Sequence, residues 1–356
     1  MKQNTAVICL SRVNGGMELA SVKLARLLSE NIHIEFIARD KSYIADKKEH
    51  FQDCDVNLNT LNFSSNLSFN LIFGIRKILV ENNIKNIIFL GASEIKSLYF
   101  STLGLDINFI IRQGSKKTTP KKDLFHKLFY SNVIHFVGNC EYMKKNIIDI
   151  LPIAKKADVT RIYSSVKLEE NVTFKKYNET IDLISVGRIN PGKGQLESIK
   201  ACEILFKNKI KFKIKFLGDF QNKEYCKKIE DYIKDIPYKD CIEFIGYTSN
   251  IKEHLQQSDI FIFPSLGEGM SNAIIESLGF GLIPIIYDDT SSPEFKNLGF
   301  HIHLTKENNV ENLQEILLQI VSNIKFEKNE AMKNHLKALE IFALEREKKE
   351  YMELLK

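Results

Sequence analysis

Short apolar runs of strand length alternate with segments of helical periodicity along this chain, and the alternation occurs twice. The first series has strand-like runs at 5–10, 33–38, 86–90, 108–112, 133–138 and 158–163, with helical segments near 17–29, 68–81, 93–101, 120–130 and 140–150. The second has strand-like runs at 181–186, 211–218, 242–246, 259–265, 283–288 and 299–304, with helical segments at 193–207, 222–234, 250–257 and 270–278, and a helical tail from about 307. This alternation is typical of parallel sheets with helices on both faces. No element is assigned within 39–67, which is rich in Asn, Asp, Lys and Ser.

The two series predict two α/β domains in tandem. Between them, residues 164–180 lose the apolar periodicity and carry mixed charge. A length of 356 residues suits about two domains. We therefore predict an N-terminal Rossmann-like domain over 1–165, a linker over 166–180, a second Rossmann-like domain over 181–335 and a C-terminal helix over 336–356.

Composition narrows the class of protein. The chain is 44% hydrophobic and 27% charged, as expected for a soluble globular protein. Its six cysteines are scattered without a CxxC pair, which favours reduced thiols over a zinc site or disulfides. The first apolar run is too short for a signal peptide, and no apolar stretch is long enough to span a bilayer. We expect a cytoplasmic protein, either free or peripheral at the inner face of the membrane.

The stretch Phe263–Asp288, FPSLGEGMSNAIIESLGFGLIPIIYD, predicts a strand end, a glycine-rich loop, a helix and the next strand. Two glutamates lie in it at fixed spacing, Glu268 in the loop and Glu276 about two helical turns later. Backbone N–H groups at a helix N-terminus bind anions. The segment therefore suits a ligand with both phosphates and hydroxyls. The alternative is an ordinary strand–loop–helix unit with two solvated glutamates.

A glycine-rich turn, SVGRINPGKG (185–194), follows the first strand of the second series. Gly187 and Lys193 fit the P-loop pattern G-x-x-x-x-G-K, but Gly194 stands where that pattern needs Ser or Thr to hold magnesium. What remains is a turn with Arg188 and Lys193 at a strand end, where open α/β sheets bind ligands. Two cations there suit a diphosphate. The alternative is a solvated surface turn.

Three further turns follow strands. In NGGMELA (14–20), Gly15 and Gly16 allow a ligand to approach the backbone closely. FLGDF and FIGYTSN place Asp219 and Tyr247 at the same sheet edge as the glycine-rich turn. The alternative for each of the three is a plain βα turn.

Taken in order, these motifs resemble the retaining glycosyltransferases of group 1, also called family four. The resemblance lies in VGRINPGKG, FLGD, FIGY and, above all, the E-x7-E pair Glu268 and Glu276 in GEGMSNAIIESLGFGLIPI. It is specific over about 181–290 and rests, in the first domain, on the glycine pair and the strand–helix layout. It implies a GT-B fold, in which two Rossmann-like parallel-sheet domains face each other across a cleft and a C-terminal helix crosses back to the first domain.

The resemblance also implies a donor site on the second domain for a UDP- or GDP-linked sugar, used as co-substrate with no further cofactor. Arg188 and Lys193 would hold the diphosphate, Glu276 the ribose hydroxyls, and Glu268 the donor sugar. The catalytic candidates are Arg188, Lys193 and Glu268. The two cations would stabilise the departing diphosphate, and Glu268 would lie at the reacting sugar. The other residues implied to bind the nucleotide sugar are Gly15, Gly16, Gly187, Asp219, Tyr247, Gly269, Met270, Ser271 and Asn272.

We therefore expect a retaining hexosyltransferase that moves a sugar to a glycan or lipid-linked acceptor in surface polysaccharide, lipopolysaccharide or glycolipid synthesis. A nucleotide-sugar 2-epimerase of the same architecture and a non-catalytic nucleotide-sugar-binding subunit are the alternatives. One departure concerns the acceptor side. Many relatives carry a histidine after a middle strand of the first domain, whereas this chain reads FIIRQGSKKTTP (109–120), so that Arg112 or Gln113 would take the position.

Metal and nucleic-acid binding have little support in the sequence. The eight histidines show no His-x-x-x-His or HExxH spacing. Asp53-Cys54-Asp55 has the D-x-D pattern of some metal-dependent sugar transferases, but it follows no clear strand and is interpreted as a solvated loop. Base-stacking motifs and Trp are absent. We expect neither a metal site nor a nucleic-acid partner.

The segment 112–156 is strongly basic. It holds ten Lys or Arg residues against three acidic ones, a net charge of +7, while the whole chain carries +5. Such a cluster is either a solvated face or a site for anionic phospholipid or a phosphorylated glycolipid. LFHKLFY (124–130) supplies apolar residues beside the lysines, either for insertion at a membrane surface or for burial in the core.

Overall fold

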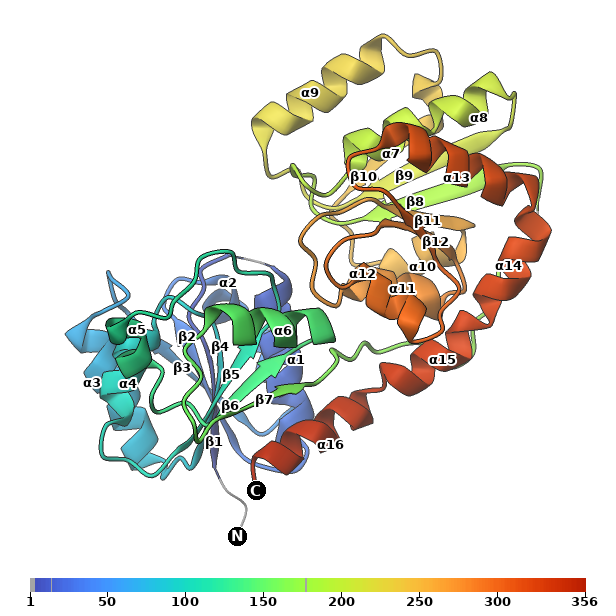
Figure 1. The fold of residues 1–356 in the computed structure, drawn as a ribbon. Coiled ribbons are helices and arrows are strands. Elements are labelled where there is room, and N and C mark those ends of the chain that lie inside the picture. The colour runs from blue at the N-terminus through green and yellow to red at the C-terminus, as the bar shows by residue number, and fades with distance from the viewer. Residues whose placement is uncertain (1–3, 14, 177) are drawn as a thin grey trace. The chain divides into compact units, whose positions relative to one another are not determined.

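The computed structural model describes residues 4–13, 15–176 and 178–356, which form two compact units (Figure 1). The first unit contains the described residues up to Ser164 together with Leu344–Lys356, and the second runs from Ser165 to Ala343. Each unit is built on its own parallel sheet with helices packed against it. The predicted α/β class with two Rossmann-like parallel sheets is therefore confirmed.

The sheet of the first unit has seven parallel strands in the order β3-β2-β1-β4-β5-β6-β7. These strands are β1 (Thr5–Cys9), β2 (Ile34–Arg39), β3 (Val56–Leu61), β4 (Asn86–Leu90), β5 (Asn108–Gln113), β6 (His135–Gly138) and β7 (Asp158–Arg161). The helices are α1 (Gly16–Ser29), α2 (Tyr43–Asp46), the 3-10 turn η1 (Lys48–Phe51), α3 (Phe69–Glu81), α4 (Ile95–Thr102), α5 (Leu124–Phe129) and α6 (Glu141–Ile150). The sheet is buried on both faces, since successive residues Val7 and Ile8 of β1 belong to different core clusters. This explains why the central strands read as continuous apolar runs.

The second unit has six parallel strands in the order β10-β9-β8-β11-β12-β13. They are β8 (Ile181–Val186), β9 (Phe212–Leu217), β10 (Ile242–Gly246), β11 (Ile260–Phe263), β12 (Ile283–Tyr287) and β13 (His303–Thr305). The helices are α7 (Gln195–Ala201), α8 (Glu203–Lys207), α9 (Lys223–Lys234), η2 (Lys239–Cys241), α10 (Ile251–Gln256), α11 (Asn272–Gly279), α12 (Ser292–Asn297), α13 (Val310–Ser322), α14 (Ile324–Met332) and α15 (Asn334–Ile341).

Strand order reverses once in each sheet, next to its first strand. In the first unit the reversal lies between β1 and β4, and in the second between β8 and β11. Open α/β sheets bind ligands outside the carboxyl ends of the strands at this switch point. The loops that follow these four strands are therefore the places to look for sites.

The C-terminal helix α16 (Leu344–Leu354) belongs to the first unit. It packs on α1, where Lys23 Nζ and Glu347 Oε2 lie 2.6 Å apart, and Tyr351 is fully buried in the core of that unit. The expected C-terminal helix began at residue 336, but 336–343 belong to the second unit, with most of α15.

Three local features differ from the sequence-based expectation. The unassigned segment 39–67 contains β3, an edge strand whose sequence VNLNTL is polar because much of it is solvated. The single helix expected over 193–207 is divided at Cys202 into α7 and α8. The short helix α12 was not predicted, because it covers only six residues.

Candidate donor site and acceptor pocket

The glycine-rich turn after β8 is the first component of the site in the second unit. Gly192 and Gly194 flank Lys193 with φ angles of +85° and +74°, in the left-handed region that glycine adopts without strain. A Cβ atom at Gly194 would lie 2.2 Å from the carbonyl oxygen of Pro264. The turn therefore packs directly against the chain that leaves β11, and only glycine fits there.

The loop between β11 and α11 is the second component, and its backbone is bonded to the glycine-rich turn. The N–H of Leu266 donates to the carbonyl oxygen of Gly192 at 2.8 Å, and Ser265 Oγ lies 3.2 Å from the same oxygen. At the other side of the loop, the N–H of Gly267 donates to Asp289 Oδ2 at 2.5 Å. The two loops thus hold each other at the switch point between β8 and β11.

Lys193 and Glu268 form an ion pair that joins the two loops. The same carboxylate oxygen of Glu268 accepts a hydrogen bond from Ser265 Oγ at 2.6 Å, and Thr290 Oγ1 donates to the Glu268 carbonyl oxygen at 2.6 Å. Both charged side chains are half-buried. The ammonium of Lys193 is therefore positioned at the sheet edge while part of it stays open to solvent.

Glu276 lies in the second turn of α11 and is half-buried. Burial raises the pKa of its carboxyl from 4.5 to about 7, and the positive charge of Lys252 offsets this only in part. An ionised carboxylate that has lost solvent in this way gains from a ligand that donates hydrogen bonds to it. Perturbed carboxyls at a ligand-binding edge are candidates for function.

Ser271, the N-cap of α11, makes no side-chain bond to the first turn of that helix. The N–H groups of this turn are therefore open to an anion.

The other predicted residues of the second unit lie at the same edge, after β8, β9, β10 and β11. Gly187 is approached so closely by the next strand end that a Cβ at Gly218 would lie 2.1 Å from its carbonyl oxygen. Arg188, Asp219 and Tyr247, which follow β8, β9 and β10, are exposed. In the loop before α11, Gly269 and Met270 are buried and Ser271 is half-buried, and Asn272, the first residue of the helix, is exposed.

Gly15 and Gly16 lie in the first unit. Gly15 is the extended N-cap residue of α1, and Gly16 is the first residue of that helix. A Cβ at Gly16 would meet no described atom within 4 Å. The described surroundings therefore do not require glycine at this position. Asn14, which opens the predicted motif, lies outside the described residues.

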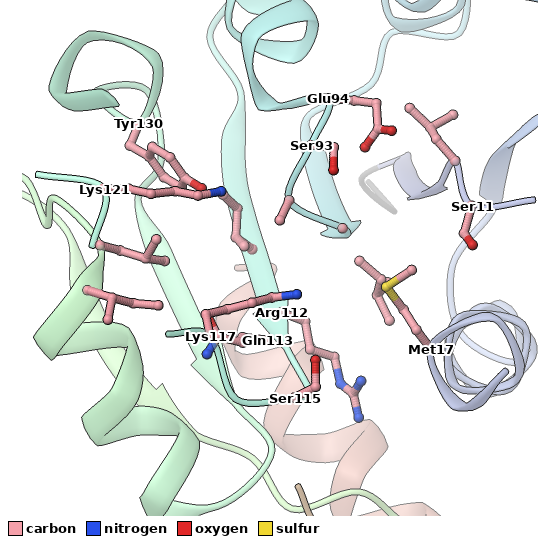
Figure 2. A pocket seen from close by; sticks show the side chains of 18 of the residues that line it. Ser11, Met17, Ser93, Glu94, Arg112, Gln113, Ser115, Lys117, Lys121 and Tyr130 are labelled. Carbon is pink, nitrogen blue, oxygen red and sulfur yellow. The ribbon is translucent and has the colours of Figure 1, made fainter. Parts of the chain in front are cut away.

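The first unit has a cavity of about 410 Å³ at the carboxyl ends of β1, β4 and β5 (Figure 2). We call it the basic pocket, because Arg12, Arg39, Arg112, Lys117 and Lys121 all line it. Among the described lining residues, Glu94 supplies the one carboxylate. Figure 2 shows Glu94 and Ser93 across the pocket from Lys121.

Electrostatics in the basic pocket favour an anionic ligand. Burial lowers the pKa of Lys121, and the positive charges of Lys117 and Lys96 lower it further. Burial likewise raises the pKa of Glu94, which weakens the one opposing charge, although Arg39 counteracts this shift. Bringing a phosphate between these groups relieves the mutual repulsion of the cations. Lys121 belongs to the basic segment 112–156 predicted from the sequence, whereas Glu94 was not predicted, although its position shortly after β4 was available as a signal.

Arg112 and Gln113, the candidates for the missing histidine position, both line the basic pocket and are buried. Arg112 Nη2 donates to Ser164 Oγ at 2.7 Å, and Gln113 Nε2 donates to Asn146 Oδ1 at 2.7 Å. Figure 2 shows the Arg112 guanidinium turned away from Glu94 and Lys121. Both side chains are therefore held in the pocket wall by hydrogen bonds to other residues of the protein.

Two parallel-sheet α/β units, with a cationic turn and paired glutamates at the switch point of the second, agree with the GT-B fold expected from the sequence. Residues 166–338 match the family model of the glycosyl transferases group 1. The second unit is thus similar to the group 1 glycosyltransferases.

Similar sequences carry glycosyltransferase names. An uncharacterized glycosyltransferase of Haemophilus influenzae is 28% identical over 159 residues, a match that spans 44% of this chain and only 43% of that protein. The capsular polysaccharide biosynthesis glycosyltransferase CapH of Staphylococcus aureus is 26% identical over 83% of this chain and 85% of CapH. The GalNAc-alpha-(1->4)-GalNAc-alpha-(1->3)-diNAcBac-PP-undecaprenol alpha-1,4-N-acetyl-D-galactosaminyltransferase of Campylobacter jejuni is 24% identical over 75% of this chain and 74% of that enzyme.

Solved structures share the fold along the whole chain. A glycosyltransferase from Rickettsia africae superposes with a TM-score of 0.85 and 17% identity, over 100% of this chain and 98% of that one. Anabaena Alr3699/HepE, in complex with UDP and glucose, superposes with a TM-score of 0.76 and 13% identity, over 99% and 98%. The sequence relatives favour a glycosyltransferase over the 2-epimerase and the non-catalytic subunit.

Proposed function

We propose that this protein is a retaining hexosyltransferase that moves a sugar from a UDP- or GDP-linked donor to a glycan or lipid-linked acceptor. The observation that carries the proposal is the convergence of Arg188, Lys193, Glu268 and Glu276 on one switch point of the second sheet. Its relatives CapH and the Campylobacter jejuni transferase support polysaccharide or lipid-linked oligosaccharide synthesis as the setting.

The proposed donor contacts follow from charge and position. Arg188, Lys193 and the first-turn N–H groups of α11 hold the diphosphate, which carries the developing negative charge when the glycosidic bond breaks. Glu276 accepts hydrogen bonds from the ribose hydroxyls. Glu268 and the backbone after it hold the donor sugar, whose anomeric carbon becomes oxocarbenium-like. No metal is needed in this scheme, because side chains supply the positive charge.

The remaining predicted residues take supporting parts. We assign Tyr247 and Asp219 to the nucleoside, because both are exposed at the ends of neighbouring strands. We propose that Gly15 and Gly16 let a ligand come close to the backbone, because neither has a side chain. Open space surrounds Gly16, so the fold itself does not demand glycine there.

The basic pocket of the first unit is our candidate for the acceptor. Its excess of cations suits the phosphate or diphosphate of a lipid-linked sugar. The Campylobacter jejuni relative acts on a PP-undecaprenol substrate by its name, which is an acceptor of this chemistry. A neutral glycan would gain little from the lysines.

Helix α5 offers a way to reach such an acceptor at a membrane surface. Its Leu124 and Phe125 are 80% and 74% exposed, and Leu128 is 46% exposed, while Phe129 is buried. The sequence left two roles open for the apolar residues of 124–130, insertion at a membrane surface and burial in the core. We propose insertion for Leu124 and Phe125, whereas Phe129 packs in the core. Lys122 and Lys127, close to these residues in the sequence, are exposed as well, and each lysine near an anionic surface contributes about 1 kcal/mol. No helix in the described ranges is long and apolar enough to cross a bilayer.

The test of the function is release of nucleoside diphosphate from a panel of UDP- and GDP-sugars, with and without lipid-linked acceptors. We expect release that requires an acceptor, and NMR of the product should show retained anomeric configuration. Epimerised donor formed without an acceptor would overturn the transferase. An inverted product would overturn retention alone.

The membrane proposal has a separate test, sedimentation with liposomes of graded anionic lipid content. We expect salt-sensitive binding that is lost when Lys116, Lys117, Lys121 and Lys122 are changed to Glu, and weakened by Phe125→Ser. A parent protein that ignores anionic liposomes at low salt would contradict it and favour a soluble acceptor.

A further inference from the structure

Two histidines and a glutamate of the second unit meet away from the donor site. His301 Nε2 lies 2.6 Å from Glu327 Oε2, and His303 Nε2 lies 2.8 Å from the same oxygen. The three side chains are half-buried, with exposures of 29%, 20% and 12% in the order of the chain. Within the described ranges, this is the one group of three or more His, Cys, Asp or Glu residues whose ligand atoms all lie within 4.8 Å of one another.

The chain brings these side chains together in a simple way. His303 is the first residue of β13 and His301 precedes it by two residues, the spacing at which residues of an extended chain point to the same side. Glu327 lies in the first turn of α14. The signal for this pair in the sequence is His-x-His beside an edge strand, which differs from the His-x-x-x-His spacing of helical metal sites.

The geometry is held by neighbouring groups. The amide of Asn334, a buried residue of α15, accepts from the N–H of His301 and donates to its carbonyl oxygen, both at 2.8 Å. His303 is held by pairing of β13 with β12, in register with Ile285. The histidine backbones are thus fixed before any ligand arrives, which lowers the entropic cost of binding one.

We propose that His301, His303 and Glu327 bind a divalent first-row transition metal ion, with zinc as the fitting example. Two imidazoles and one carboxylate form a ligand set that such ions take, and solvent can complete the coordination because all three side chains are partly open. A tetrahedral ion with bonds of about 2.0–2.2 Å keeps its ligand atoms about 3.3–3.6 Å apart. The histidine nitrogens therefore need to move away from the Glu327 oxygen by less than about 1 Å, within the reach of side-chain rotation.

The position of the site indicates a structural role. The histidines lie at the amino end of β13, whereas the proposed donor residues lie at the carboxyl ends of the strands. A metal there joins the edge strand of the sheet to α14, between segments about 25 residues apart. The inference is independent of the donor assignment, and transfer itself needs no metal.

The test uses the full chain, stripped with a chelator and then freed of it. Zinc titrated by isothermal calorimetry should bind with one tight site per chain. At a free zinc concentration of about 100 times Kd, the melting temperature should rise by about 5–10 °C. Glu327→Gln keeps an acceptor oxygen for both imidazoles but removes the anionic ligand, and it should weaken zinc binding at least about tenfold. His303→Gln should do the same.

A matched control is His33→Gln in the first unit. His33 also contacts two carboxylates, but through different ring nitrogens, Nδ1 to Asp55 and Nε2 to Glu35. This variant should bind zinc as the parent does. If His303→Gln fails to fold, Glu327→Gln decides the question. Zinc that does not bind the parent below about 100 μM, or binds Glu327→Gln equally well through thiols or other histidines, would overturn the proposal.

Discussion

Replacing Glu276 with Gln should stabilise the free protein and weaken nucleotide binding at the same time. Burial raises the pKa of the Glu276 carboxyl to about 7 in the folded protein, above its usual 4.5. Between these two pH values the folded protein keeps a proton that the unfolded chain has released. The stability contributed by the protonated carboxyl is complete below pH 4.5 and is lost as the pH rises through 7. At pH 8 the folded protein therefore bears the cost of a buried carboxylate.

The magnitude follows from the two pKa values. Each tenfold change in an ionisation constant corresponds to about 1.4 kcal/mol, so the cost at pH 8 is at most about 3.5 kcal/mol. Solvent at the half-buried side chain reduces this to roughly 2 kcal/mol. A neutral Gln of the same shape removes the cost, which raises the melting temperature of a unit of this size by about 4–8 °C. The same change deprives ribose hydroxyls of a charged acceptor, worth about 1.5–3 kcal/mol of binding.

The assay is thermal unfolding of parent and Glu276→Gln from pH 5 to pH 8.5, with nucleoside diphosphate binding measured by calorimetry on the same samples. Glu230→Gln, on the exposed face of α9, is the control and should change neither quantity. The stabilisation should be largest above pH 7 and vanish near pH 5. A Glu276→Gln variant that is not stabilised at pH 8, or whose effect is independent of pH, would refute the assignment of a desolvated carboxylate.

Three further predictions concern the donor site and its chemistry. Arg188→Ala and Lys193→Ala should each weaken donor binding by about 1.5–3 kcal/mol, as measured by calorimetry, because each removes a charge-assisted contact; parent-like affinity in both would refute the diphosphate assignment. Glu268→Ala should chiefly lower turnover in steady-state kinetics, and a loss of nucleotide affinity as large as that of Glu276→Ala would contradict the separate roles. Transfer should survive EDTA, even if the chelator lowers the melting temperature through the histidine cluster; rescue of lost activity by magnesium or manganese would bring the Asp53-Cys54-Asp55 pattern back into consideration.

Much of the fold could be predicted from strands in which every residue is buried. Strands such as β1 and β4 are buried on both faces, so their sequences are apolar throughout and stand out against the helices. β3 has no such signal, because it lies at the sheet edge and its Asn57 and Asn59 side chains donate to Glu35 of β2. An edge strand that is half solvated looks like a loop in sequence.

The candidate site, too, could be predicted from the sequence only in part. The carboxyl ends of parallel strands share one edge, so the sequence could predict that Arg188, Lys193, Glu268 and Glu276 gather there. It could not predict that Lys193 is paired with Glu268, because that contact depends on the close approach of Gly194 to the Pro264 backbone. The basic pocket was equally hidden, since its lining comes from separate strand ends and from the loop that Asn146 ties to Lys117.

The central claim, a nucleotide-sugar donor site in the second unit, is tested most directly by thermal shift with UDP, GDP, ADP, CDP and dTDP. We predict that at least one of these diphosphates raises the melting temperature by several degrees, as mass action requires of a ligand that binds the folded state. The matching nucleoside alone should give little shift, and Lys193→Ala should abolish most of the diphosphate effect. A protein that none of the five diphosphates stabilises at millimolar concentration would contradict the account.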